Sequence, residues 1–395
     1  MSSILVNLIR FMRRMKQLAR NEYSAFVLRF FPDRWRWFEK NISQFERRGV
    51  LQAYEKPFVS FETTDICNLN CIMCETWSAT RTKGIMKMDD FVGHLDRIQA
   101  LGQNSVAFHT IGDPLMDKEV GEKLRLCYER GIEVDLRTNG LLLDKYLSVI
   151  VKYPPGRLRI SIDGGTKETY ERIRVRGKFD KLLANLNLLK GAFVKHRILC
   201  ELGVDMVVFG ENLHEIPIFY QVFHPYFKLT HMHFHIINSL SGDHGDFFDK
   251  EKLSSFSQPV PPCKMPFTSL FILHDQRVSV CCRDYHEELI VGDLKNETIE
   301  QIWSGKSIHA LREAHEQAKS TPSNLPRACR ECYSPTEHTA QVIDVFIHQV
   351  LQKSISKYGI KDLPIDQMAT EIRTYLERLS EQKLLEKNQH TVGNH

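Results

Sequence analysis

Strand-like and helix-like segments alternate six times between residues 57 and 240, and this order limits the fold more than any other feature of the sequence. Short runs rich in β-branched and aromatic residues predict strands, which span 57–63, 105–111, 132–137, 157–162, 199–209 and 231–237. Segments with apolar residues at helical spacing separate them, and these span 89–101, 117–130, 142–152, 166–195 (one or two helices, broken near Gly177) and 213–220. The order predicts a parallel sheet, but periodicity does not distinguish a doubly wound sheet from a (β/α) barrel.

Polar segments follow four of the predicted strands at their carboxyl ends. They are the loop after Cys67, Gly112-Asp113-Pro114, Thr138-Asn139-Gly140 and Asp163-Gly164-Gly165. In both candidate folds, ligands bind at the carboxyl ends of the strands. The sequence therefore predicts that these segments share one site.

Ten cysteines occur in the 395 residues, too few for a disulfide scaffold, and most of them are clustered. The chain begins with a short apolar run that arginines interrupt, without a secretory cleavage site. No stretch reaches the ~18 apolar residues that a membrane-spanning helix needs. We therefore expect a cytoplasmic protein, in whose reducing surroundings clustered cysteines act more often as metal ligands than as disulfides.

The first cluster is Cys67-Asn-Leu-Asn-Cys71-Ile-Met-Cys74, with the spacing C-x3-C-x2-C. Three thiolates so close together in a loop can converge on one metal centre. A structural zinc ion takes four ligands, and this loop contains no histidine to supply the fourth. Three cysteines suit a [4Fe–4S] cluster better, because they hold three irons and leave the fourth open. Zinc remains the alternative.

With this spacing after the first strand, the chain resembles the radical S-adenosylmethionine (radical SAM) superfamily over residues 57–240. The resemblance implies a partial (β/α)6 TIM-like barrel and a [4Fe–4S] cluster whose open iron binds S-adenosyl-L-methionine. It also implies reductive cleavage of that cofactor to a 5′-deoxyadenosyl radical, which takes a hydrogen atom from the substrate. A reductant such as flavodoxin or ferredoxin would supply the electron, and the protein would position the reactants.

Two segments near the cysteines carry the resemblance further. The residue before the third cysteine is usually aromatic in the family and is Met73 here, where its thioether fills similar space near the adenine. Gly112-Asp113-Pro114 is similar to the family's Gly-Glu-Pro segment, which binds the ammonium group of the cofactor. By itself this tripeptide is an ordinary turn.

The resemblance assigns cofactor contacts on two further strands. Asn139 matches the end of the third strand, and it is otherwise a turn residue; Ser161 and Asp163 match the end of the fourth strand. Arg174 matches a position that pairs with the cofactor carboxylate. A solvated helix arginine is an equal alternative for Arg174.

A second group of cysteines comprises Cys263, Cys281, Cys282, Cys329 and Cys332. Apolar runs at 269–273 and 277–281 predict a hairpin that brings the first members together, and the C-x2-C pair closes the site. By spacing alone a zinc ribbon fits. The region also resembles the twitch/SPASM type of C-terminal extension, which implies one auxiliary [4Fe–4S] cluster.

We expect Cys263, Cys281, Cys329 and Cys332 to be the ligands of the auxiliary cluster. Successive residues of a strand point to opposite faces, so only one of Cys281 and Cys282 should be a ligand. The separation between Cys281 and Cys263 is similar to that in one-cluster members of the family, which favours Cys281. Cys282 remains the alternative.

These features divide the chain into five parts and predict an α/β fold. The parts are a basic helical N-terminal extension (1–52), the partial barrel (53–240), a linker (241–259), a small α+β cluster-binding domain (260–337) and a helical C-terminal tail (338–395). Residues 1–50 hold eleven Lys and Arg against four Asp and Glu, a net charge of +7. This segment would contact a membrane surface weakly or an acidic partner, or else pack on the main body as an amphipathic helix. It has no base-stacking pattern, so we expect no specific nucleic-acid partner.

If all irons of the auxiliary cluster are ligated, the cluster suits an electron acceptor and favours a net oxidation, dehydrogenation or cross-link. The resemblance leaves the substrate open between a peptide or protein side chain and a carbohydrate-type small molecule. His233 and His235 share one strand face and, with His109, are candidates to line the pocket, although each is also explained as an exposed or core histidine. The alternative function is a non-enzymatic zinc or iron–sulfur protein that binds nucleic acid.

Overall fold

The computed structural model describes residues 53, 56–77, 79–237, 263, 265–318, 321–330, 332 and 337–376. The predicted N-terminal extension (1–52), the linker (241–259) and the end of the tail lie outside the described residues. None of the helices in these ranges is long and apolar enough to cross a lipid bilayer.

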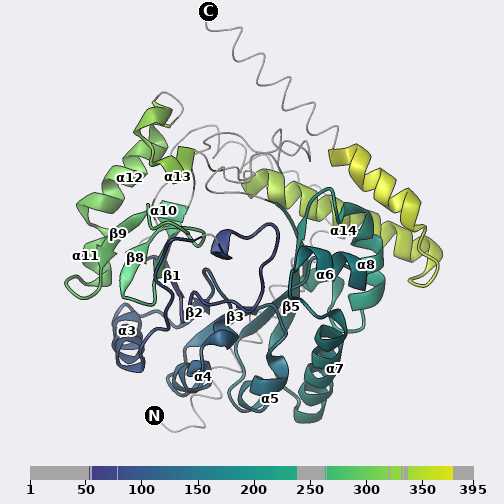
Figure 1. Cartoon of the computed structure of the whole chain (residues 1–395), viewed down its shortest axis with the longest axis horizontal. Helices are drawn as coiled ribbons and strands as arrows, with labels where there is room; N and C mark the ends of the chain where they lie inside the picture. Colours follow the sequence, from purple (N-terminus) through teal and green to yellow (C-terminus); the bar gives the residue numbers. More distant parts are fainter. Residues whose placement is uncertain are drawn as a thin grey trace, which may run out of the picture.

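Six parallel strands form the body of the protein, in the spatial order in which they follow one another along the chain. They are β1 (Phe58–Phe61), β2 (Ser105–Phe108), β3 (Glu133–Thr138), β4 (Arg157–Ser161), β5 (Glu201–Val208) and β6 (Met232–Ile236). The strands curve into an open ring with helices outside it (Figure 1). This architecture decides between the two folds that the periodicity allowed: it is a partial TIM-like barrel.

Helices cover the outer face of this sheet. They are α3 (Met88–Ala100), α4 (Val120–Glu129), α5 (Leu143–Lys152), α6 (Lys167–Ile173), α7 (Phe179–His196) and α8 (Ile216–Phe223). The predicted break near Gly177 separates α6 from α7. The helix expected from residue 117 begins at Val120, because the carboxylate of Asp117 instead caps the backbone N–H of Glu119 and pairs with buried Lys123 at 2.6 Å.

Residues alternate between two environments along each strand. On β3, β4 and β5 the outward residues, such as Leu136, Ile160 and Met206, are buried beneath the helices. Most of the inward residues are polar and half-buried or paired: Arg159, for example, lies 3.3 Å from the carboxylate of Asp205. The outer face therefore supplies the apolar core, and the inner face, called the lumen face below, carries mostly polar side chains.

The C-terminal part continues the sheet of the barrel. Strand β7 (Ser269–Ile272) pairs in parallel with β1, with Val59 opposite Leu270. Strands β8 (Arg277–Ser279) and β9 (Ile290–Asp293) follow in antiparallel order, so the predicted hairpin is confirmed. Helices α10 (Met265–Thr268), α11 (Ile299–Trp303), α12 (Lys306–Glu316) and α13 (Arg327–Arg330) complete this part. It is thus joined to the barrel through β1, beside the first cysteine loop.

Helix α14 (Glu337–Tyr358) closes the other edge of the ring. Asp344 accepts a hydrogen bond from the backbone N–H of Phe234 at 2.8 Å, and His348 Nε2 lies 2.8 Å from the carbonyl oxygen of Met232. These side chains satisfy backbone groups that the edge strand β6 would otherwise expose. The predicted helical character of the tail is confirmed for α14 and for residues 365–376.

Short 3-10 turns connect several elements. They are η1 (Glu75–Trp77), η2 (Pro114–Met116), η3 (Leu213–Glu215), η4 (Leu229–His231) and η6 (Pro322–Asn324). The first two belong to the loops after β1 and β2, where the sequence predicted the site.

Candidate functional site

The loop after β1 carries Cys67, Cys71 and Cys74 at the carboxyl end of the sheet. Its backbone is attached to the end of α6, because Asn70 N–H donates to the carbonyl of Val175 at 3.0 Å and Ile72 N–H donates to that of Ile173 at 2.9 Å. The loop is thereby held over the ends of the strands rather than extending from the barrel.

All three cysteines of this loop are free thiols, and each of Cys67 and Cys71 is close enough to feel the charge of Cys74. Burial raises the pKa of the Cys67 thiol to about 11 and that of Cys71 to about 12. Within the described ranges, no three His, Cys, Asp or Glu side chains are spaced to hold a single metal ion. In a [4Fe–4S] cluster each thiolate binds a different iron, and this donor set fits such a group.

Gly112 brings the loop after β2 against the loop after β1. It has a φ of +83°, and a Cβ there would lie 2.8 Å from Cα of Asp65, so no other residue fits without strain. Asp113 N–H donates to the carbonyl of Ile66 at 2.9 Å. The predicted Gly112-Asp113-Pro114 segment therefore lies directly beside the cysteine loop.

The carboxylate of Asp113 is buried and engaged by the chain itself. It accepts hydrogen bonds from the backbone N–H groups of Leu115 and Asn139, at 2.9 and 2.7 Å, and from the hydroxyl of Thr138. Burial raises its pKa, although these donors oppose the shift. Asp113 thus ties the end of β3 to the loop after β2, while its contact with a cofactor stays a prediction.

Asn139 connects β3 to the cysteine loop. Its side-chain NH2 group donates to the side-chain carbonyl of Asn68 at 2.7 Å, and its side-chain carbonyl accepts from the backbone N–H of Leu141 at 3.0 Å. Asn139 is therefore both a turn residue and a neighbour of the cysteines, so the two interpretations are compatible.

Arg174 is buried, with 6% of its surface exposed, so the alternative of a solvated helix arginine is wrong. Its guanidinium lies 2.6 Å from the carboxylate of Asp163, which also accepts the N–H of Val207. Burial disfavours the cation, but Asp163 and Cys71 outweigh this effect and raise the pKa of Arg174. Its Nε is buried without a hydrogen-bond partner. A free donor beside the cysteine loop fits the carboxylate of an amino-acid cofactor.

Met73 and Ser161 are both half-buried, Met73 in the cysteine loop and Ser161 at the end of β4 on the lumen face. Their predicted contacts with a cofactor remain predictions.

The second group of cysteines is also brought together. Cys263 and Cys329 each feel the charge of Cys332, and burial raises the pKa of the Cys263 thiol to about 11. The charge of Cys282 helps to raise the pKa of both Cys263 and Cys332, and Cys282 shares a hydrogen bond with Cys281. Separation along the chain favours Cys281 as the fourth ligand, whereas these contacts favour the alternative, Cys282.

Two of the three predicted pocket histidines, His233 and His235, lie on the inner face of the barrel. His109, after β2, hydrogen-bonds to Cys282, so it faces the auxiliary cysteines. On β6, His235 Nε2 lies 3.4 Å from Asp205 Oδ1, and the side chain is 49% exposed. His233 lies beside it, 6.2 Å between ring centroids, and 3.9 Å from Asp344.

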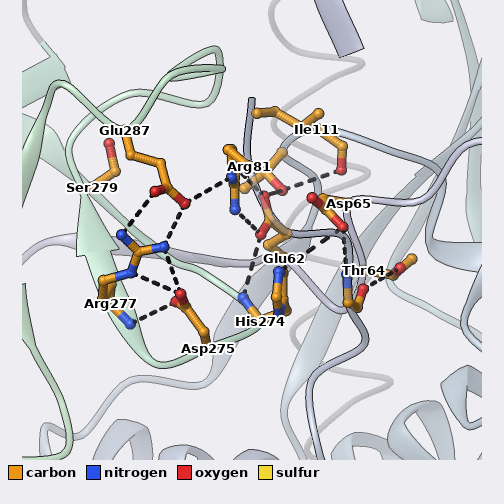
Figure 2. Close-up of polar contacts among 12 residues, drawn as sticks. Glu62, Thr64, Asp65, Arg81, Ile111, His274, Asp275, Arg277, Ser279 and Glu287 are labelled. Carbon is orange, nitrogen blue, oxygen red and sulfur yellow. Dashed lines mark hydrogen bonds and ion pairs between the residues drawn. The ribbon is translucent and has the colours of Figure 1, made fainter. Parts of the chain in front are cut away.

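A row of ion pairs, buried at Arg81 and Glu62 and partly exposed at Arg277, joins the two cysteine-bearing parts (Figure 2). Arg81, from the first cysteine loop, donates to both oxygens of Glu62 at 3.0 and 2.5 Å and to Glu287 at 3.1 Å. Glu287 pairs in turn with Arg277, which also binds Asp275. The alternating charges run from β1 through the cysteine loop into β8 and its neighbouring loops.

Sequence reasoning missed Arg81, Glu62 and Glu287, and it also missed Arg283 and Tyr285 beside the cysteines. Arg283 hydrogen-bonds to the sulfur of Cys332, and Tyr285 Oη lies 4.0 Å from Cys74 Sγ. The only signal for the last two was their position next to the Cys281-Cys282 pair. Nothing in the sequence links Arg81 to partners so far along the chain.

Two family models match the chain. The model of the radical SAM superfamily covers residues 61–222, and that of the iron–sulfur cluster-binding SPASM domain covers residues 263–333. Each family match contains one of the two cysteine groups.

Curated relatives match part of the chain. The AdoMet-dependent heme synthase of Methanosarcina barkeri is 28% identical over 193 residues, which are 48% of this chain and 53% of that protein. The GTP 3′,8-cyclase of Limosilactobacillus fermentum is 32% identical over 143 residues, 34% of this chain and 43% of that protein. The chain thus spans about half the length of the curated relatives it matches.

Solved structures share the fold. Streptococcus suis SuiB bound to the precursor peptide SuiA has a TM-score of 0.54 and 10% identity, covering 76% of this chain and 75% of that one. The enzyme anSMEcpe with bound AdoMet and the Cp18Cys peptide has a TM-score of 0.51 and 16% identity, covering 83% of this chain and 100% of that one. At these identities the likeness is one of fold.

Proposed function

We propose that this chain, which belongs to the radical SAM superfamily and carries a C-terminal SPASM domain, reductively cleaves S-adenosyl-L-methionine and removes a hydrogen atom from its substrate. The observation that carries the proposal is the convergence of three free thiols, the Gly112 segment and the buried Arg174 at the carboxyl ends of the strands. Bound there, the cluster and its cofactor supply an organic radical.

The residues of the chain would hold and orient these groups. Cys67, Cys71 and Cys74 hold the cluster, and Arg174, whose Nε has no partner, receives the cofactor carboxylate. Asp163 orients Arg174 through the 2.6 Å ion pair. Gly112-Asp113-Pro114 offers backbone carbonyls to the cofactor's ammonium group.

The reaction that we propose is a net oxidation, such as a dehydrogenation or a cross-link. Cys263, Cys329, Cys332 and one of the adjacent Cys281 and Cys282 would hold the auxiliary cluster, which supplies an electron acceptor. An oxidation also needs a proton acceptor on the lumen side. His235 suits this role because Asp205 orients its Nε2 while half of the side chain stays exposed.

The polar side chains of the lumen face support a polar substrate, either a peptide or protein side chain or a carbohydrate-type small molecule. That face carries paired charges, such as Arg159 with Asp205. Two structures of this fold hold peptides, so peptides are the first class to screen. A flavodoxin- or ferredoxin-type reductant in the cytoplasm would supply the electron. Because both cysteine groups fall within the matched families, no observation favours the zinc and nucleic-acid alternative.

Anaerobic purification followed by turnover with S-adenosyl-L-methionine and dithionite tests the proposal. We expect a brown protein with about eight irons per chain that forms 5′-deoxyadenosine. Replacing Cys67, Cys71 and Cys74 by alanine should remove about half of the iron and all of the product. The matched control, Cys127→Ala in α4, alters a buried core cysteine and should retain both. A colourless protein that binds only zinc, or one that forms no 5′-deoxyadenosine, would contradict the proposal.

His235→Gln tests the proton acceptor separately. Cleavage of S-adenosyl-L-methionine without substrate should persist, while oxidation of the substrate falls. The matched control is His224→Gln, a histidine whose ring bonds to the carbonyl of Gln221 at 2.8 Å. An equal loss of substrate oxidation in the two variants would contradict a role of His235 as the proton acceptor.

A further inference from the structure

The loop between β8 and β9 lies between the two cysteine groups. On one side Arg283 hydrogen-bonds to Cys332 and lies close enough to Cys282 for their charges to interact. On the other side, Tyr285 contacts Cys74 of the first. One short segment of the C-terminal domain thus reaches both sites.

Two hydroxyl groups lie against the sulfur of Cys74. Thr76 Oγ1 is 3.0 Å away and belongs to the same loop, whereas Tyr285 Oη is 4.0 Å away and comes from the other domain. Sulfur is a large acceptor, so its hydrogen bonds are longer than those to oxygen, and the contact with Tyr285 is a long one. A phenol has one O–H to donate, and a metal-bound thiolate is a better acceptor than a thiol.

The loop that carries Tyr285 is held from within. The carboxylate of Asp284 accepts the hydroxyl of Ser279 at 2.8 Å and the backbone N–H groups of Glu288 and Leu289 at 2.8 and 3.0 Å. Glu287 adopts a left-handed conformation with a φ of +60°. An unfavoured backbone conformation persists where surrounding contacts enforce it, and here they fix the direction of Tyr285.

The loop is also held to the first cysteine loop from outside. Glu287 binds Arg81 at 3.1 Å, and Arg81 binds Glu62 of the segment that follows β1 (Figure 2). His286 Nδ1 lies 3.5 Å from the hydroxyl of Thr80. These contacts flank Tyr285 on its C-terminal side and keep its hydroxyl beside Cys74.

We propose that Tyr285 is a positioning residue of the first cluster: its hydroxyl donates a hydrogen bond to the Cys74 thiolate and raises the reduction potential of that cluster. The inference rests on the proposed function, since it requires a cluster on Cys74. A hydrogen bond to a ligand sulfur favours the reduced cluster because that state carries more negative charge. The C-terminal domain thus makes the first cluster easier to reduce.

Tyr285→Phe removes only the hydroxyl and tests the proposal. The readout is the midpoint potential of the S-adenosyl-L-methionine-sensitive cluster signal in an EPR-monitored redox titration. We expect a more negative midpoint, with the ratio of reduced to oxidised cluster at the wild-type midpoint falling by roughly threefold or more. Tyr226→Phe is the matched control, because it removes a tyrosine hydroxyl that bonds to Asn187 at 3.0 Å, away from the cysteines. Its midpoint should stay at the wild-type value.

Glu287→Gln gives a second measurement that leaves Tyr285 in place. It weakens the contact with Arg81 and should shift the midpoint in the same direction by a smaller amount. An unchanged midpoint in Tyr285→Phe with full iron content overturns the proposal. If Tyr285→Phe does not retain iron, an unchanged midpoint in Glu287→Gln overturns it. A protein without any cofactor-sensitive cluster signal would instead refute the proposed function itself.

Discussion

Arg81→Met removes one partner of the most deeply buried ion pair between the cysteine loop and the barrel. The side chains of Arg81 and Glu62 are 1% and 0% exposed, so water cannot replace the lost partner. Breaking a buried pair on one side costs about 3–5 kcal/mol, because a charge is left unpaired. Thr110 and the backbone N–H of His274 still donate to Glu62, so we expect the lower end of this range, about 3 kcal/mol.

Thermal and urea unfolding of the anaerobic protein, followed by circular dichroism, would measure this loss. At about 2 °C per kcal/mol for a large domain, Tm should fall by roughly 6 °C. The double variant Glu62→Gln/Arg81→Met should recover most of the loss, because the neutral amide needs no counter-charge. Asp180→Asn serves as the control, since its pair with Lys167 is exposed to solvent and its loss should leave the stability nearly unchanged.

Two results would refute this reasoning. The first is an Arg81→Met protein whose stability lies within about 0.5 kcal/mol of the wild type, as for an exposed pair. The second is a double variant no more stable than the single one, because the loss would then come from packing around Arg81 and not from the charge of Glu62.

Three further predictions concern the backbone, pH and the cluster ligands. Gly112→Ala should cost more than about 1 kcal/mol and weaken binding of S-adenosyl-L-methionine in equilibrium dialysis, whereas Gly191→Ala, in helix α7 with open space around it, should be neutral or stabilising. Burial lowers the pKa of His94 from 6.5 to about 4, so its neutral form favours folding and stability is lost as pH falls below the unfolded value. His94 should account for a loss of about 1 kcal/mol in urea unfolding between about pH 7.5 and about pH 5.5, and buried His315, whose pKa is also lowered to about 4, should add a similar loss. His94→Leu should remove only the first part, and an unchanged pH dependence in this variant would exclude His94 as a source. Only one of the two variants Cys281→Ala and Cys282→Ala should lose about four irons, as measured by elemental analysis. Retention of all iron in both variants would show that neither cysteine is a ligand.

The sequence determined the parts of this protein that depend on local pattern. Apolar spacing of about two or 3.6 residues predicts strands and helices because it reflects which face each element buries. For that reason the six strands, the break near Gly177 and the hairpin at 269–281 were predictable. The C-x3-C-x2-C spacing was equally informative, because three thiols within one loop need no tertiary structure to be close.

Only the tertiary structure decided how distant segments meet. The parallel pairing of β7 with β1 brings Tyr285 to Cys74 across 211 positions and Glu287 to Arg81 across 206. The tertiary structure also showed that Arg174 is buried against Asp163, whereas the sequence fitted a solvent-exposed arginine equally well. Such contacts depend on the packing of the whole chain, and no periodic pattern records which charges or hydroxyls will face one another once the sheet has closed.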